Sequence, residues 1–308
     1  MSKAVGYSEY GGPEVLEVIE VPEPHAGDGE VRVAVRAAGL NPFDFKVRRG
    51  GYIPNHQLPS LQGAEFAGVI DEVGAGVTGW SVGDEVLGWI GRGAQAEYVV
   101  VPASQIAAKP AGLDWAVAAG IGLVANTARR SVDSLELGPD DTVLVTAAAG
   151  GVGIVTVQFA KATGATVVGT ASEANHEFLR GLGVIPVAYG DIPGGTSELE
   201  RLRAAVPGDY TAALDTIGGN AIRIALALGI PPERINTVAD RGAIDELGVN
   251  GVGGGKKTSA ELAEFARQAA DGELVIPIRG TYQLSDVVAA FEDAETGHGL
   301  GKVVLLVP

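Results

Sequence analysis

TVLVTAAAGGVG, residues 142–153, is the stretch that decides the fold of the middle of the chain. Its apolar first half predicts a buried strand, the small residues after it predict a tight turn, and residues 153–163 predict a helix. The first N–H groups of that helix and the positive end of its dipole would point at the turn, where a pyrophosphate can bind. Gly150 and Gly151 let the backbone approach phosphates, and Gly153 lets the helix pack closely on the strand. The stretch therefore predicts a dinucleotide-binding site.

Strands and helices continue to alternate after this stretch. Residues 166–170 predict a strand, residues 176–182 a helix, residues 212–215 the end of a further strand, and residues 222–228 a helix. Strict alternation is typical of βαβ units around a parallel sheet. We therefore expect an α/β fold with a Rossmann-type parallel sheet.

The first third of the chain has a different pattern. Short β-branched segments are separated by glycine and proline at residues 15–21, 30–37, 67–73 and 84–89. Such spacing predicts a β-rich domain, a small barrel or a sandwich. An alanine-rich helix is expected over residues 116–128. The last segment, residues 274–308, returns to strand-like pieces around a helix at 285–295.

Composition excludes several classes of protein. The 308 residues carry a net charge of −16, which disfavours binding of nucleic acid. The chain has no cysteine, so it has no disulfide framework, no cysteine nucleophile and no cysteine-ligated zinc. The N-terminus lacks the apolar region of a signal peptide, and no apolar run is long enough to cross a bilayer. We expect two domains, a cytoplasmic location and an acidic surface that serves solubility.

The end of the second predicted strand bears on the choice of cofactor. An acidic residue there would hold the ribose hydroxyls of NAD and repel a 2′-phosphate, but residues 169–172 are GTAS. This neutral end favours NADPH over NADH. Glu173 follows at once and no Lys or Arg is near before Arg180, so the phosphate would have to rely on Ser172, Asn175 and His176.

Several motifs in sequence order resemble the zinc-free medium-chain dehydrogenase/reductases, in particular their quinone oxidoreductase-like branch. They are GLNPFDFK at 39–46, GAEFAGVI at 63–70, SVGDEV at 81–86, AAAGGVG at 147–153 with VQ at 157–158, GTAS at 169–172, LDTIGG at 214–219 and GHGLGK at 297–302. The resemblance covers essentially the whole chain. It implies a GroES-like substrate domain over residues 1–118, completed by 272–308, and a Rossmann domain over 119–271.

The resemblance also implies an activity and a catalytic loop. Members of this branch reduce quinones, or carbon–carbon double bonds conjugated to a carbonyl, with NADPH. Zinc-dependent relatives have Cys where Asn41 stands and His where Ala64 stands. Hydride would therefore go to an acceptor that is already electron-poor, without zinc. The catalytic candidates are Asn41, Asp44, Lys46 and Tyr52.

Each catalytic candidate other than Asn41 has an alternative interpretation. Lys46 could donate a hydrogen bond to a developing oxyanion, or it could be a solvated surface lysine. Asp44 could take part in proton transfer, or it could make a turn contact after Pro42. Tyr52 could donate or stack, or only pack. None of these residues is an obvious general acid, so water could supply the proton.

The cofactor-binding candidates combine the glycine turn with positions that the resemblance implies. They are Thr127, Ala149, Gly150, Gly151, Val152, Gly153, Thr170, Ala171, Ser172, Asn175, His176, Tyr189, Thr216, Ile217, Val238, Ala239, Gly253 and Gly254. The glycine-dense segment 251–255 could also serve flexibility alone. Departures from the usual pattern at Gln95, Asn126 and Arg129 put the substrate in question more than the fold.

Alternatives to the reductase remain open at this stage. The chain could bind a nucleotide and have lost its reductase chemistry, or have redirected it to a non-redox step in biosynthesis. It could also be an alcohol dehydrogenase with a borrowed metal. The four histidines have no metal-ligand spacing, and Ser172 lacks the glycine elbow of a hydrolase. The expected partners are a small electrophilic acceptor and, by the resemblance, a second copy of the chain in a homodimer.

Overall fold

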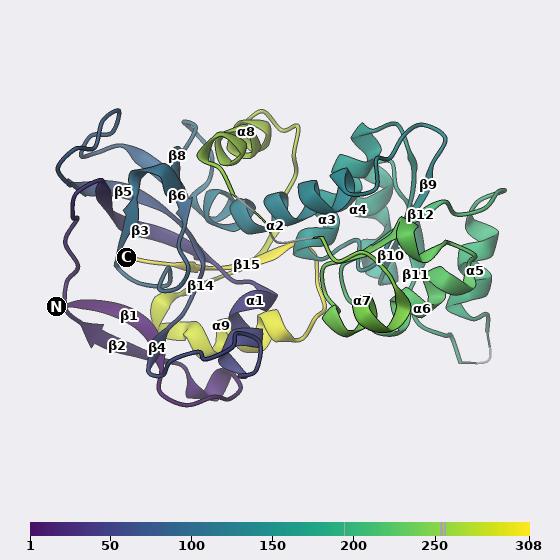
Figure 1. Cartoon of the computed structure of the whole chain (residues 1–308), viewed down its shortest axis with the longest axis horizontal. Helices are drawn as coiled ribbons and strands as arrows, with labels where there is room; N and C mark the ends of the chain where they lie inside the picture. Colours follow the sequence, from purple (N-terminus) through teal and green to yellow (C-terminus); the bar gives the residue numbers. More distant parts are fainter. Residues whose placement is uncertain (194, 253–254, 256) are drawn as a thin grey trace. The chain divides into compact units, whose positions relative to one another are not determined.

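The chain forms two compact units (Figure 1). The structure is a computed structural model that describes residues 1–193, 195–252, 255 and 257–308. Unit 1 contains residues 1–123 and 257–308, and unit 2 contains residues 124–256. Helix α2 (Trp115–Asp133) begins in unit 1 and ends in unit 2. Helix α8 (Ser259–Ala270) lies in unit 1, although the sequence prediction assigned its residues to the Rossmann domain.

Unit 2 contains the predicted parallel sheet. In the described part of the chain its strand order is β11-β10-β9-β12-β13, and all four pairings are parallel. The strands are β9 (Thr142–Val145), β10 (Thr166–Ala171), β11 (Ile185–Ala188), β12 (Ala212–Asp215) and β13 (Ile235–Thr237). The order reverses at β9, so its carboxyl end is the switch point at which such sheets bind ligands.

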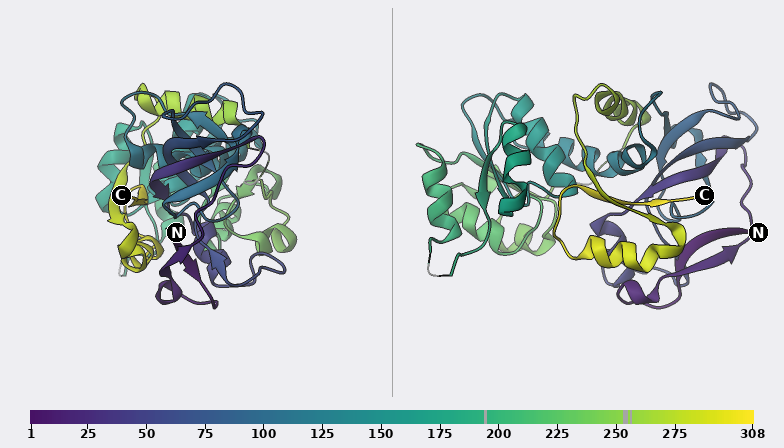
Figure 2. Two further views of the ribbon diagram at one scale, coloured as in Figure 1. Left: turned by 90° about the vertical axis from the view of Figure 1, so that its left-hand side faces the viewer. Right: turned by 180° about the vertical axis from the view of Figure 1, so that it is seen from behind.

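Helices pack against this sheet (Figures 1 and 2). Helix α3 contacts β9 and β10, α4 and α5 contact β11, α6 contacts β12 and β13, and α7 contacts β13. Their bounds are α3 (Gly151–Ala162), α4 (His176–Gly181), α5 (Glu198–Ala205), α6 (Asn220–Ala227) and α7 (Arg241–Leu247), with short 3₁₀ helices η3 (Glu173–Asn175) and η4 (Pro232–Arg234). The apolar core of the unit includes Leu144, Val168 and Ala213, one from each of three neighbouring strands.

Unit 1 contains the β-rich part of the chain. In the described residues one sheet has the order β2-β1-β4, and a larger one has the order β14-β15-β3-β5-β6-β8, with β7 paired to β3. The strands are β1 (Ser2–Tyr7), β2 (Glu17–Val21), β3 (Glu30–Gly39), β4 (Ser60–Leu61), β5 (Glu65–Val73), β6 (Glu85–Trp89), β7 (Tyr98–Pro102), β8 (Ile106–Ala108), β14 (Ile278–Gln283) and β15 (Lys302–Leu306). Helices α1 (Pro42–Arg48) and α9 (Val287–Glu295) and the 3₁₀ helices η1 (Pro13–Val15), η2 (Ala103–Gln105) and η5 (Leu284–Asp286) complete it.

The last residues of the chain pair with a strand of its first third. Strand β15 pairs antiparallel with β3, with Val304 opposite Gly39 and Leu306 opposite Ala37. Figure 2 shows this C-terminal strand, in yellow, beside the purple and blue strands of the N-terminal segment. Phe291 of α9 and Leu305 of β15 are buried in the same core as Val33 and Phe66.

One predicted strand starts later than expected. The sequence predicted a strand from residue 15, but residues 13–15 form η1 and β2 begins at Glu17. Pro13 fixes its own φ in the helical range, and the Leu16 N–H donates to the Pro13 carbonyl. This contact closes a turn before the strand can start.

Among the helices in the described part of the chain, none combines the length and apolar character that a bilayer span requires.

Candidate active site

The turn between β9 and α3 has the geometry of a phosphate-binding turn. Ala147 lies in the left-handed region, with φ +47°, and its carbonyl accepts the Gly150 N–H. Helix α3 starts at Gly151, and no side chain among the described residues caps it. A Cβ on Gly153 would lie 2.2 Å from the Ala147 oxygen, so only glycine fits there. The first turn of α3 therefore offers backbone N–H groups to an anion at the carboxyl edge of the sheet.

Asp215, at the end of β12, organises the neighbouring loop. Its buried carboxylate accepts the Thr146 hydroxyl and the Thr237 hydroxyl, each at 2.6 Å, and the Gly218 N–H at 2.9 Å. These contacts join the ends of β9, β12 and β13. Sequence reasoning missed this residue, although LDTIGG was one of the motifs. The sequence feature that could have identified it is an acidic residue at the end of a buried strand.

The predicted contacts to the adenosine phosphate lie together after β10. Asn175 Nδ2 donates to Ser172 Oγ at 3.1 Å, and His176 Nε2 lies 3.3 Å from the Ala171 carbonyl. Thr170 is buried, and its hydroxyl accepts the Ala147 N–H at 3.2 Å. Thr170 therefore supports the turn between β9 and α3 from the side.

Other predicted cofactor residues of unit 2 lie on several elements. Thr127 is on α2, Tyr189 follows β11 and is 48% exposed, and Ile217 follows β12 and is 62% exposed. The Thr216 hydroxyl donates to the Thr146 carbonyl, the Val238 N–H to the Asp215 carbonyl, and the Ala239 N–H to the Thr237 hydroxyl. Ala149 and Val152 belong to the turn and to the start of α3. Gly253 and Gly254 lie outside the described residues.

In unit 1 a buried polar cluster surrounds Asn41. The Asn41 side chain donates to Glu65 Oε1 at 2.8 Å and accepts from Lys302 Nζ at 2.6 Å. Lys302 Nζ also lies 2.6 Å from the Leu40 carbonyl oxygen and 3.1 Å from Glu65 Oε1, and the Leu123 N–H donates to Glu65 Oε2. Asn41, Glu65 and Lys302 are each less than 5% exposed. Both polar groups of the Asn41 side chain are thus bonded within the unit.

Sequence reasoning missed Glu65 and Lys302 as site residues. Both lie in quoted motifs, GAEFAGVI and GHGLGK, but they are 237 positions apart. An acidic residue that opens an apolar strand was the available signal, because an acid in a buried strand needs a partner.

Asp44 lies next to this cluster, in the first turn of α1. Its carboxylate accepts the Asn41 N–H at 2.8 Å, which is a helix-capping contact. Burial raises the pKa of Asp44 to about 7, against the opposing effects of that hydrogen bond and of Lys302 and Arg48. The Asp44 carboxyl therefore takes up and releases a proton near neutral pH.

Lys46 and Tyr52 contact each other. Lys46 Nζ lies 5.8 Å from the centre of the Tyr52 ring, in cation–π geometry, and the Phe43 ring meets Tyr52 edge-on at 5.9 Å. The structure thus brings Asn41 and Asp44 together in the buried cluster, and Lys46 and Tyr52 together beside it.

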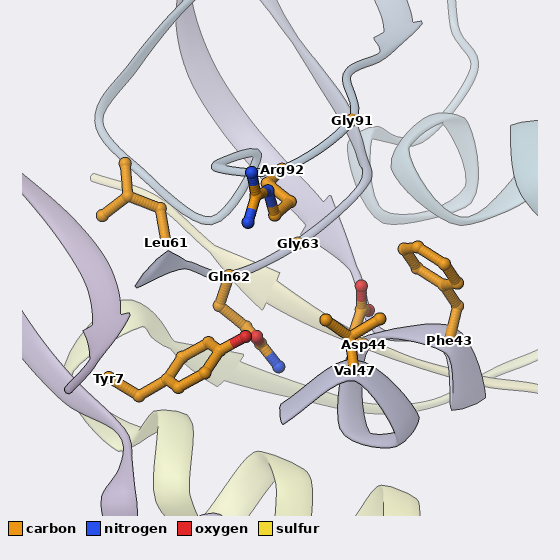
Figure 3. A pocket seen from close by; sticks show the side chains of 9 residues that line it. All are labelled: Tyr7, Phe43, Asp44, Val47, Leu61, Gln62, Gly63, Gly91 and Arg92. Carbon is orange, nitrogen blue, oxygen red and sulfur yellow. The ribbon is translucent and has the colours of Figure 1, made fainter. Parts of the chain in front are cut away.

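Unit 1 also contains a small cavity of about 10 Å³ beside α1 (Figure 3). Its apolar lining comes from Phe43, Val47 and Leu61, and its polar lining from the residues Tyr7, Asp44, Gln62 and Arg92, with Gly63 and Gly91 between them. A space of this volume is about the size of one water molecule.

Comparison with known proteins agrees with this geometry. Residues 27–111 match the family model "Alcohol dehydrogenase GroES-like domain", and residues 191–305 match "Zinc-binding dehydrogenase". An NADPH-dependent alkenal/one oxidoreductase of Arabidopsis thaliana is 32% identical over 98% of this chain and 79% of its own length. The chain belongs to the quinone oxidoreductase-like branch of the medium-chain dehydrogenase/reductases. The quinone oxidoreductase of Mus musculus is 29% identical over 99% of this chain and 98% of its own.

Solved structures of the same family are similar along the whole chain. The quinone oxidoreductase of Coxiella burnetii matches with a TM-score of 0.89 and 31% identity, over 100% of this chain and 99% of its own. The Escherichia coli quinone oxidoreductase, solved with NADPH, matches with a TM-score of 0.85 and 26% identity, over 99% of each chain. These matches and the parallel sheet confirm the predicted fold class, a Rossmann domain with a GroES-like domain.

The donor set around Asn41 does not fit zinc. The chain contains no cysteine, Ala64 has no ligand atom, and the side chains of Asn41 and Glu65 are bonded to each other and to the Lys302 ammonium group. A zinc ion there would have to displace that ammonium group and would find carboxylate and amide oxygens in place of the sulfur and nitrogen ligands that it prefers.

Substitution Lys302→Met should destabilise the protein by about 3–5 kcal/mol, because it leaves the Glu65 carboxylate buried without a cation. Urea unfolding of the full chain measures the loss. Lys109→Met is the matched control: Lys109 is also buried, but its partner Glu85 is half exposed, so the loss should be smaller. Adding Glu65→Gln to Lys302→Met should recover stability. Equal losses in the two lysine variants would contradict this account of the cluster.

Substitution Asp44→Asn should reduce the dependence of stability on pH. The pKa of Asp44 is about 7 in the folded chain, against an ordinary value of 3.8, so folding favours the protonated carboxyl. Its ionisation therefore costs stability progressively as pH rises from about 4 to 7. The Tm of the variant should exceed that of the unsubstituted protein at pH 8 by a few degrees, and the two should converge near pH 4. A Tm difference that is constant over this range would contradict the prediction.

Substitution Gly153→Ala should weaken NADPH binding about tenfold or more, because the added Cβ displaces α3 from the Ala147 carbonyl. Isothermal titration with NADPH measures the loss. Gly181→Ala is the matched control, since no atom outside the local chain lies within 4 Å of a Cβ there and its φ is not positive. Unchanged affinity of Gly153→Ala would show that the turn does not hold the cofactor.

Proposed function

We propose that this chain is a zinc-independent, NADPH-dependent oxidoreductase that delivers hydride to a quinone or to the C=C bond of an α,β-unsaturated carbonyl. The observation that carries this proposal is the Asn41–Glu65–Lys302 cluster. In it the Lys302 ammonium group occupies the oxygen atoms that a metal ion at this place would need as ligands. Without a metal to polarise it, the acceptor must already be electron-poor. Quinones and conjugated carbonyls meet that condition. The names of the Arabidopsis and mouse relatives support the same activity.

The choice of NADPH rests on unit 2. The N-terminal N–H groups of α3 would bind the pyrophosphate. Ser172, Asn175 and His176 would bind the 2′-phosphate, and Ala171 ends β10 without the acid that would repel it. NADPH, when bound, supplies the hydride. The name of the Arabidopsis relative and the NADPH in the Escherichia coli structure support this cofactor.

The residues of unit 1 would act on the acceptor. Hydride addition to the β-carbon of an enone moves an electron pair onto the carbonyl oxygen, and a proton at the α-carbon then completes the reduction. Asp44 lines the cavity and carries a proton near neutral pH, so it would supply or relay that proton. Asn41, held at both ends of its side chain, would act as a positioning residue. Lys46 and Tyr52 would bind the developing oxyanion.

The sequence predictions of a cytoplasmic location and of a homodimer are part of this proposal. The first rests on the N-terminal sequence and the second on the family resemblance. The mass of the purified chain in solution tests the second, and a monomer at micromolar concentration would contradict it.

Turnover tests the proposed reaction directly. Loss of NADPH absorbance should follow the addition of 1,4-benzoquinone, 2-cyclohexenone or a 2-alkenal, and kcat/KM with NADPH should exceed that with NADH by about tenfold or more. Treatment with a zinc chelator should leave the rate unchanged. NADPH binding without turnover of any acceptor would contradict the reductase and favour a non-redox role for the nucleotide.

A further inference from the structure

The cavity beside α1 is too small for an acceptor but large enough for one water molecule. Its volume is about 10 Å³, and a single water needs about 10–15 Å³ of such space. A buried water also needs polar partners, and the side chains of Tyr7, Asp44 and Gln62 line this cavity. Size and lining therefore both suit a bound water.

Gln62 is one group that a water in this cavity would satisfy. It is 3% exposed, and Figure 3 shows its side chain running into the space between Tyr7 and helix α1. Its nitrogen Nε2 has no hydrogen-bond partner among the described residues. A buried amide N–H without a partner is unfavourable, so an acceptor oxygen in the cavity would stabilise it.

Asp44 presents a carboxylate oxygen to the same cavity. Its Oδ2 accepts the Asn41 N–H at 2.8 Å, whereas Oδ1 has no hydrogen-bond partner in the part of the chain that the structure describes. Burial raises the pKa of Asp44 to about 7, so this carboxyl gains and loses a proton near neutral pH. Because Asp44 is only 3% exposed, a proton that it gives away must be returned through the protein.

Tyr7 and His56 lead from the cavity to the surface. An Arg92 guanidinium N–H donates to His56 Nδ1 at 2.9 Å, so that nitrogen is an acceptor and Nε2 carries the proton of the ring. Nε2 then donates to the Tyr7 hydroxyl oxygen at 2.8 Å. Burial raises the pKa of Tyr7, so its hydroxyl keeps its own proton for donation into the cavity. Tyr7 is buried, His56 is partly exposed and Arg92 is exposed, so this chain of hydrogen bonds ends at solvent.

We propose that the cavity binds one water molecule, and that this water, Tyr7 and His56 form the path by which protons from solvent reach Asp44. The inference rests on the proposed reductase function, in which Asp44 gives a proton to the reduced acceptor. Gln62 holds the water by donating to its oxygen. Histidine suits the outer end of such a path, because its ring accepts a proton on one nitrogen and gives one up from the other.

Each turnover moves one proton inward along this path. The Asp44 carboxylate takes a proton from the water, the water takes one from the Tyr7 hydroxyl, and Tyr7 takes the one on His56 Nε2. His56 Nδ1 takes a proton from solvent while the Arg92 N–H turns to the Ser60 hydroxyl oxygen, its other partner at 3.4 Å. His56 returns to its first tautomer by proton exchange with solvent. The net change is the transfer of one proton from solvent to Asp44, and no group is oxidised or reduced.

Substitution Tyr7→Phe tests the path, because it removes the hydroxyl and keeps the ring. With NADPH and 2-cyclohexenone, whose α-carbon must be protonated, kcat should fall about tenfold or more. Imidazole added to the buffer should restore much of the loss, because a small diffusible acid can replace the relay. Tyr10→Phe is the matched control: its hydroxyl donates to the His56 backbone carbonyl at 3.0 Å, outside the path, so kcat should change less than about twofold. An unchanged kcat in Tyr7→Phe, or a loss that imidazole does not restore, would overturn the proposal.

An infrared measurement separates this inference from the proposed function. At about pH 5.5 the Asp44 carboxyl is protonated while ordinary carboxyl groups are ionised, so Asp44→Asn identifies its C=O stretching band in the spectrum of the full chain. Tyr7→Phe should shift this band, because the water bonded to Asp44 loses its donor, and Tyr10→Phe should leave the band in place. If the unsubstituted chain reduces no acceptor, the proposed function fails and the band still decides the contact. A band that Tyr7→Phe does not move overturns the proposed path.

A variant of His56 repeats the test at the outer end of the path. The rings of Tyr7 and Tyr10 each lie 6.0 Å from the His56 ring, so both phenylalanine variants keep their ring contacts and should fold. His56→Ala removes the imidazole group itself, and free imidazole should then raise its rate toward that of the unsubstituted chain. Failure of imidazole to raise the rate of His56→Ala would likewise overturn the proposal.

Discussion

The Lys302 ammonium group joins β15 to two segments of unit 1 that are remote from it in sequence. It contacts the connection between β3 and α1 through the Leu40 carbonyl and the Asn41 side chain, and the start of β5 through Glu65. Three oxygens around a buried cation offset its desolvation, which an isolated ion pair would not do. Much of the surrounding sequence follows from this arrangement. At Gly39, for example, a Cβ would lie 2.5 Å from Glu65 Oε1 and 2.6 Å from the Ala119 carbonyl.

At the carboxyl edge of the sheet in unit 2, a buried carboxylate plays the part that the ammonium group of Lys302 plays in unit 1. Asp215 accepts hydrogen bonds from groups at the ends of three parallel strands. Asn236, in β13, extends this order by donating to the Ser131 hydroxyl and accepting the Val252 N–H. Buried polar groups with their bonds satisfied fix loops more specifically than apolar packing does. The loops that would surround a dinucleotide are therefore held by side chains below them, which leaves backbone groups available to the ligand.

The local features of the chain were predictable from its sequence, and the long-range ones were not. The β9–α3 turn lies within one short stretch, and its glycines indicate its geometry. Residues 142–153 were therefore sufficient to predict the strand, the turn and the helix. Asp44 and Asn41 could be paired because they are three positions apart in one loop. The contact between Glu65 and Lys302 depends on the pairing of β15 with β3, and no local pattern encodes that pairing. The predicted limits of the units differ from the observed ones at α8. The amphipathic pattern of α8 predicts a helix, but it does not show which unit that helix joins.

The pairing of β15 with β3 also constrains the order in which the protein can fold. Unit 2 is one continuous segment and can complete its sheet while later residues are still being synthesised. Unit 1 cannot complete its larger sheet so early, because Glu65 of β5 gains its ammonium partner only after Lys302 has been synthesised. The β-rich segment of the first hundred residues thus waits with an incomplete sheet for most of synthesis. In the folded protein the net negative charge of this segment favours solubility. During synthesis the same charge would protect the incomplete sheet from aggregation.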